Sequence, residues 1–111
     1  MQKLQQIADW QVKQIAELLR QYPSEQVVIA DYTAEEFAEL KRGENYAEYL
    51  AIRQMVLDRL RELGIAARVI LHQVDSVKYY RFLAEHRIEH DSKALAYFAD
   101  VDYRKSQEQK S

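Results

Sequence analysis

The chain has 111 residues, a net charge of −2 and no cysteine, and 48% of its residues are hydrophobic. This length suits one domain, and the lack of cysteine excludes disulfides, thiolate nucleophiles and cysteine-ligated zinc and fits a cytoplasmic protein. Two glycines and one proline are too few for an all-β fold. No apolar run reaches the ~18 residues of a membrane span, so no membrane association is expected. The slightly acidic balance does not favour nucleic-acid binding.

The first part of the chain predicts a helix, a strand and a second, short helix. Apolar residues recur at spacings of three, four and seven over residues 4–22, and Pro23 ends this helix, while Trp10 and Val12 lie off its main stripe. Residues 26–32 contain a continuous apolar run, which is typical of a parallel strand covered on both faces. Thr33 and Glu36 form a capping-box pattern that begins a helix ending near residue 42.

The middle of the chain predicts a β-α-β unit, in which the crossover makes the two strands parallel. A long helix over residues 45–63 ends before Gly64, and a second strand follows within residues 66–75. The helix has an apolar surface too broad for contact with the sheet alone. Its stripe consists of Tyr49, Ile52, Val56, Leu60 and Leu63, widened by Leu50, Met55 and Leu57.

The last third predicts a helix over residues 76–88, with Ser76 as its cap, and then an ambiguous segment. On that helix Val77, Tyr80, Leu83 and Ala84 share one face. Residues 92–103 fit both an alternating strand and a helix, and the preceding Asp91–Ser92 cap together with the alanines favours the helix. Residues 104–111 are polar and predict a disordered tail. Residues 1–103 therefore predict one small α/β domain with a sheet of two or three strands, and α+β is the alternative.

The segment His86-Arg87-Ile88-Glu89-His90 matches the H-x-x-E-H pattern of inverted zinc proteases. That chemistry needs both histidines on one helical face and a third ligand. We expect the helix to stop near Arg87, which would separate His86 from His90. We therefore predict no zinc site here, and we interpret both histidines as surface residues at a helix end.

Four aspartates define an alternative, enzymatic hypothesis. Asp31 and Asp75 follow the two strands, and Asp100 and Asp102 would follow a third strand if the last segment formed one. Carboxylates at that edge of a parallel sheet can hold Mg²⁺ for nuclease or phosphoryl-transfer chemistry. The simpler interpretation is that aspartates cap helices and turns, and the chain has no glycine-rich phosphate loop.

The stretch from Lys78 to Phe82 mixes basic and aromatic residues. Such a mixture is typical of protein-binding hot spots, and it can also stack bases and neutralise phosphates. Our first hypothesis is a non-catalytic interaction or regulatory protein that needs no cofactor, binds a protein partner and forms a homodimer. Nucleic-acid binding is the weaker alternative. The residues expected to contact a partner are Lys78, Tyr79, Arg81 and Arg87.

Overall fold

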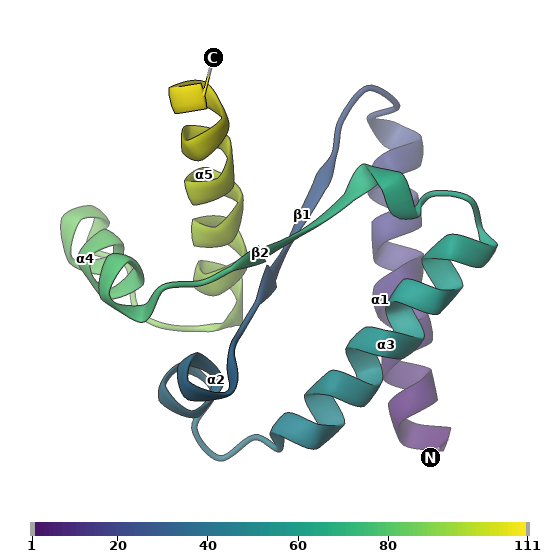
Figure 1. The fold of residues 1–111 in the computed structure, drawn as a ribbon, viewed down its shortest axis with the longest axis horizontal. Coiled ribbons are helices and arrows are strands. Elements are labelled where there is room, and N and C mark those ends of the chain that lie inside the picture. The colour runs from purple at the N-terminus through teal and green to yellow at the C-terminus, as the bar shows by residue number, and fades with distance from the viewer. Residues whose placement is uncertain (1, 111) are drawn as a thin grey trace. The chain divides into compact units, whose positions relative to one another are not determined.

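A computed structural model describes residues 2–110 of the chain (Figure 1). The predicted order of helices and strands is confirmed, and the arrangement is α/β. The elements are α1 (Gln2–Gln21), β1 (Val27–Asp31), α2 (Ala34–Leu40), α3 (Tyr46–Glu62), the short 3₁₀ turn η1 (Ala66–Arg68), β2 (Val69–Gln73), α4 (Ser76–His86) and α5 (Ser92–Lys110).

The ambiguous last segment is helical, as its cap and alanines indicated. The Ala94 amide donates to Asp91 Oδ1 over 2.7 Å at the start of α5. The helix also continues through residues 104–110, where we expected a disordered tail. Arg104 Nε donates to Asp100 Oδ1 over 2.8 Å, one helical turn back. This part of the helix contains neither proline nor glycine, so nothing in the sequence stops its propagation.

The two strands form a two-stranded parallel sheet. The Val74 amide donates to the Asp31 carbonyl over 2.9 Å, which continues the pairing beyond β2. Residues 27–30 and 69–72 are only half-buried. Our expectation of strands covered on both faces is therefore not met in the described residues. The last segment is a helix, so it does not add a third strand to the sheet either.

Contacts within the chain define two compact units, and the division falls inside both strands. In the described part of the chain, unit 1 consists of residues 2–27 and 43–70, and unit 2 consists of residues 28–42 and 71–110. None of the helices in the described part is long and apolar enough to span a membrane.

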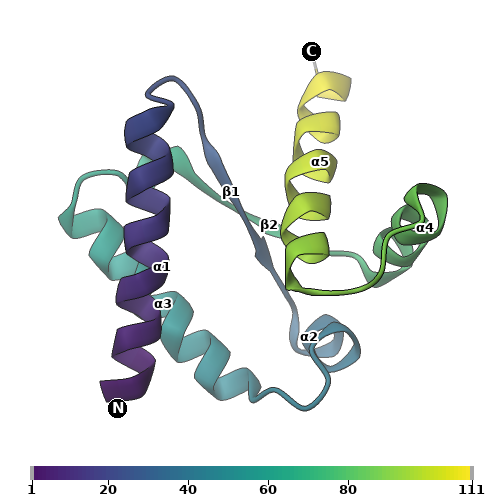
Figure 2. The ribbon, with the colours of Figure 1, turned by 180° about the vertical axis from the view of Figure 1, so that it is seen from behind.

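Unit 1 is built on the packing of α1 against α3 (Figures 1 and 2). Its core is aliphatic, and Val12 belongs to it although we had placed this residue off the main stripe. Trp10 does lie outside the core and is 63% exposed. The buried residues are Ala8, Val12, Ile15 and Leu19 of α1 and Val56 and Leu60 of α3.

Both ends of α3 follow local sequence signals. The Asn45 side chain accepts a hydrogen bond from the Glu48 amide over 3.0 Å at the first turn. At the other end Gly64 has φ of 75°, and the Ile65 amide donates to the Leu60 carbonyl over 3.0 Å. This is the Schellman arrangement, in which glycine adopts the left-handed conformation at little cost.

Arg68 binds backbone carbonyl groups at the end of α1 and in the segment that leads to β1, all within unit 1. Its Nη2 lies 3.4, 3.0 and 3.1 Å from the carbonyl oxygens of Leu19, Tyr22 and Glu25. The first two carbonyls lie at the C-terminal end of α1, where backbone acceptors have no partner within the helix. A guanidinium there also interacts favourably with the helix dipole.

Unit 2 has an aromatic core. The Phe98 ring meets the rings of Tyr79 and Phe82 at an edge, with centroid distances of 5.5 Å to Tyr79 and 5.2 Å to Phe82. Helix α4 packs against both α5 and α2. The remaining buried residues of these helices are Phe37 and Leu40 of α2, Leu83 of α4 and Ala94, Leu95 and Ala99 of α5.

Side-chain caps fix the starts of α2 and α4. Thr33 Oγ1 accepts a hydrogen bond from the Glu36 amide over 3.2 Å, as the capping-box pattern predicted. The cap of α4 is Asp75 rather than Ser76, because Asp75 Oδ1 accepts from the Val77 and Lys78 amides over 2.9 and 3.1 Å. The Ser76 amide instead donates to Glu36 Oε2 over 2.9 Å and so links α4 to α2.

Candidate interaction surface

The outer face of α4 combines exposed apolar and basic side chains. Val77 is 66% exposed and Tyr80 is 41% exposed, and Arg81 and Ala84 complete the exposed face at spacings of three and four residues. We call these four residues the α4 face. Their placement corrects our expectation that Val77, Tyr80 and Ala84 share the face of Leu83. The buried face is instead formed by Tyr79, Phe82 and Leu83.

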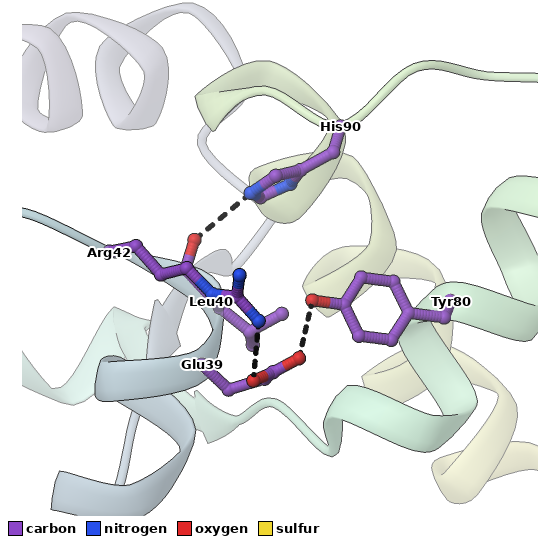
Figure 3. A network of polar contacts seen from close by, with 5 residues as sticks. All are labelled: Glu39, Leu40, Arg42, Tyr80 and His90. Carbon is purple, nitrogen blue, oxygen red and sulfur yellow. Dashed lines mark hydrogen bonds and ion pairs between the residues drawn. The ribbon is translucent and has the colours of Figure 1, made fainter.

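Tyr80 is held in place by α2 of the same unit (Figure 3). Its hydroxyl donates to Glu39 Oε1 over 3.1 Å, and Arg42 Nη2 donates to Glu39 Oε2 over 3.1 Å. These two hydrogen bonds, with the Arg42 bond first, lower the pKa of the Glu39 carboxyl. Loss of solvent around the ring, followed by the hydrogen bond to Glu39, raises the pKa of the Tyr80 phenol. Tyr80 therefore stays neutral and Glu39 ionised near neutral pH.

Of the residues expected to contact a partner, Lys78, Arg81 and Arg87 are exposed and Tyr79 is not. Tyr79 has no exposed surface, so its assignment to a partner-binding surface is wrong. The neighbouring Tyr80 is the exposed ring, and sequence reasoning missed it. Nucleic-acid binding through Lys78, Tyr79 and Arg81 likewise loses the ring that would have stacked on a base. Arg87 ends α4 in the left-handed conformation, with φ of 54°.

The phenol of Tyr79 takes part in a part-buried hydrogen-bond chain. His90 Nε2 lies 3.0 Å from the Leu40 carbonyl oxygen, which can only accept, so this nitrogen carries the proton (Figure 3). In the neutral ring Nδ1 is then an acceptor, and Tyr79 donates to it over 2.7 Å. Burial, followed by the charge of Asp91, raises the pKa of Tyr79 to about 12. These two hydrogen bonds connect α4 to the end of α2 through His90, which lies in the loop between α4 and α5.

This geometry separates the two histidines of the H-x-x-E-H match. Helix α4 ends at His86, so His90 is not on the same helical face. The His86 ring contacts Phe82, with centroids 4.4 Å apart, whereas both nitrogens of His90 are engaged with Tyr79 and Leu40. Both histidines are exposed, as expected for surface residues at a helix end, and His90 in addition links Tyr79 to Leu40 within unit 2.

The four aspartates of the enzymatic hypothesis serve different elements. Asp31 is buried at the end of β1, Asp75 caps α4, and Asp100 pairs with Arg104. Asp100 and Asp102 lie on helix α5, so the third strand that was to carry them is absent from the described residues. Across residues 2–110 no group of three or more histidine, aspartate or glutamate side chains is placed to hold a metal ion.

Asp102 forms a contact that sequence reasoning did not anticipate. Its Oδ2 lies 2.9 Å from Nε2 of His72, and the two side chains are 24% and 20% exposed. The His72 ring also meets Tyr103 at an edge, with centroids 5.8 Å apart. The residues are 30 positions apart in the chain, so no local pattern could have paired them. The contact fixes α5 against β2 within unit 2.

Comparisons with known proteins found no match to a protein family, to a curated protein or to a solved structure.

Proposed function

We propose that this protein is a non-catalytic interaction protein that binds a protein partner through the α4 face. The observation that carries the proposal is the exposure of Val77 and Tyr80 beside Arg81 on one helical face. Tyrosine and arginine are enriched among residues that dominate binding energy, and an exposed aliphatic neighbour adds apolar surface to bury.

The fixed position of Tyr80 supports this role. The hydrogen bond to Glu39 restrains the ring before any partner arrives. A side chain that is already ordered loses less conformational entropy on binding, which improves affinity without a new contact. The ring edge and Val77 then form a preorganised apolar anchor, while Arg81 can pair with a carboxylate.

The charge around the α4 face indicates the chemistry of the partner. Lys78, Arg81 and Arg87 are exposed along α4 and its end, where Glu85 is the acidic residue. Glu39 of α2, which also lies against Tyr80, is paired with Arg42. A partner surface with an apolar pocket bordered by carboxylates would complement this arrangement. Such charge complementarity contributes mainly to specificity and to the rate of association.

The test is site-specific photocrosslinking from position 77 in cells that express the protein. We expect one discrete adduct with a protein partner, and Arg81→Glu should weaken it strongly. Arg61→Glu is the matched control, because Arg61 is an exposed arginine of α3 in unit 1. Equal loss with both variants, or no adduct from position 77, would contradict the proposal.

We also propose that the chain forms a homodimer. The two-stranded sheet offers strand edges without a strand neighbour in the described residues, and its aliphatic residues are only half-buried. In unit 1 Trp10, Leu18 and Leu63 are 63%, 46% and 50% exposed. Size exclusion with light scattering should give twice the chain mass, and Trp10→Glu or Leu50→Glu should reduce it. A folded monomer for the unsubstituted chain would contradict this proposal.

A further inference from the structure

The connection between α2 and α3 carries two adjacent basic residues in an exposed turn. Lys41 is half-buried, whereas Arg42 and the three residues after it are exposed. Gly43 has φ of 83°, a conformation that glycine adopts without strain. A Cβ atom added at Gly43 would meet nothing within 4 Å, so open space surrounds this point of the backbone.

The chain passes between its two compact units at three places, and this turn contains one of them. The passage in the turn lies between Arg42 and Gly43. The other two lie between residues 27 and 28 and between residues 70 and 71, inside the paired strands β1 and β2. Hydrogen-bonded strands resist proteases, whereas an exposed loop with a small residue is a preferred site of proteolytic nicking.

The other basic residues of the chain stand in backbone that is better protected. Of the 16 lysine and arginine residues, those outside the α-helices are Lys41, Arg42, Arg68 and Arg87. Arg68 is held by its hydrogen bonds to three backbone carbonyls. The backbone amides of Arg87 and Ile88 both donate to the Leu83 carbonyl, so the peptide bond between them is fixed to the end of α4.

We infer that the peptide bond between Arg42 and Gly43 is a cleavage site for a protease of trypsin-like specificity, and that the cut chain stays assembled as two fragments. Such a protease binds a basic side chain through a carboxylate in its specificity pocket, and the Arg42 side chain is 76% exposed. Water adds to the Arg42 carbonyl carbon and the bond to the Gly43 nitrogen breaks. The products carry a carboxylate at Arg42 and an ammonium group at Gly43. This inference does not depend on the proposed protein-binding role.

Unit 1 contains segments from both sides of the cut. The first fragment carries α1, β1 and α2, and the second carries α3, β2, α4 and α5. Helix α1 of the first fragment packs against α3 of the second. Arg68 of the second fragment binds the carbonyl oxygens of Leu19 and Tyr22 in the first. Strand β1 also pairs with β2, so the sheet holds the two fragments together as well.

Unit 2 is likewise shared between the fragments, because α2 packs against α4. Phe37 and Leu40 of α2 are buried. Three hydrogen bonds cross from α2 to the second fragment, and the cut removes none of their partners. They join the Ser76 amide to Glu36 Oε2 over 2.9 Å, the Tyr80 hydroxyl to Glu39 Oε1 over 3.1 Å, and His90 Nε2 to the Leu40 carbonyl over 3.0 Å.

The first experiment is limited proteolysis of the unsubstituted chain with trypsin, followed by mass spectrometry. The first products should be residues 1–42 and 43–111. This cut should be at least about tenfold faster than the next one, since sites inside helices are cut only after local opening. A first cut at any other bond, the one after Arg87 included, refutes the site.

Two double variants separate backbone conformation from residue type. Lys41→Gln with Arg42→Gln should abolish the first cut. Arg104→Gln with Lys105→Gln is the matched control, because it removes the same kind of basic pair at exposed positions within α5. The control should leave the rate of the first cut within about twofold. A cut that persists between residues 42 and 43 without the basic pair refutes the trypsin-like specificity.

The second experiment follows the cut protein by size exclusion and circular dichroism. Both fragments should co-elute at the volume of the uncut chain and keep its helical signal, and they should separate in denaturing urea. The melting temperature should become dependent on protein concentration, because unfolding now separates two chains. Fragments that separate in native buffer, or lose helical signal when the bond is cut, refute the assembly and leave the cleavage site standing.

Discussion

The two units of the chain are stabilised in different ways. Unit 1 has a core of aliphatic side chains, and the ion pairs of α3, such as Arg59–Glu62 and Arg61–Asp58, lie on its exposed surface. Such exposed pairs contribute little to stability. Unit 2 has aromatic rings at its centre and part-buried polar contacts between side chains, among them Tyr79–His90 and His72–Asp102.

This difference bears on where each unit can tolerate change. Aliphatic packing depends on volume and is largely non-directional, so hydrophobic replacements of similar size are tolerated in unit 1. A hydrogen-bonded aromatic core depends on orientation as well, and a lost partner leaves a buried polar atom unsatisfied. Every buried side-chain nitrogen and oxygen in the described residues has a hydrogen-bond partner. Removing one of these partners from unit 2 should therefore lower its stability.

The largest expected effect comes from removing one core side chain from each unit. Phe98→Ala should lower the free energy of unfolding by about 3–5 kcal/mol, and Leu60→Ala by about 2–5 kcal/mol. Hydrogen exchange should accelerate first in the unit that carries the substitution, since local opening follows local packing. Tyr97→Ala and Leu63→Ala are the controls, because these residues are 53% and 50% exposed. If either substitution accelerated hydrogen exchange equally in both units, the two units would not have separate cores.

A smaller effect tests the directional contact in unit 2. Tyr79→Phe keeps the ring but removes the donor to His90, and it should cost about 1–3 kcal/mol because the acceptor is part-buried. Tyr97→Phe, at an exposed position of α5, should change stability by no more than about 0.5 kcal/mol. Equal effects in denaturant unfolding would show that the hydroxyl of Tyr79 contributes nothing specific.

The smallest effect is a change of stability at alkaline pH. The pKa of Tyr79 is raised from 10.0 to about 12 in the folded chain. Its contribution is therefore complete below about pH 10 and is lost as the pH rises towards 12, because the unfolded chain releases this proton first. The difference in unfolding free energy between the unsubstituted chain and Tyr79→Phe should shrink over this range. A constant difference would mean that Tyr79 ionises equally in both states.

Local signals predicted most of the secondary structure. Thr33, Asn45 and Gly64 act within one turn of their own positions, so the ends of α2 and α3 could be read from short patterns. Short patterns did not show which face of α4 is buried. Residues 77, 80 and 84 have helical spacing as regular as that of residues 79, 82 and 83, and the choice depends on Phe98 and His90, which come from further along the chain.

The sequence predicted the exposure of the charged residues on the candidate surface but not which tyrosine is exposed. Lys78, Arg81 and Arg87 are exposed as expected, because charged side chains rarely lie in a core. The two neighbouring tyrosines could not be told apart, since composition does not say which ring faces α5. The pairing of His72 with Asp102 depends on the tertiary position of α5, which no spacing in the sequence encodes.

The contacts of Arg68 have a consequence for the order of folding. The carbonyls that it binds lie 43, 46 and 49 residues earlier in the chain. During synthesis from the N-terminus, the C-terminal end of α1 therefore lacks this donor until Arg68 has been made. Closing so long a loop costs conformational entropy before the contact forms. The α1–β1 connection should consequently become ordered only after α3 has docked and brought Arg68 to the end of the first helix.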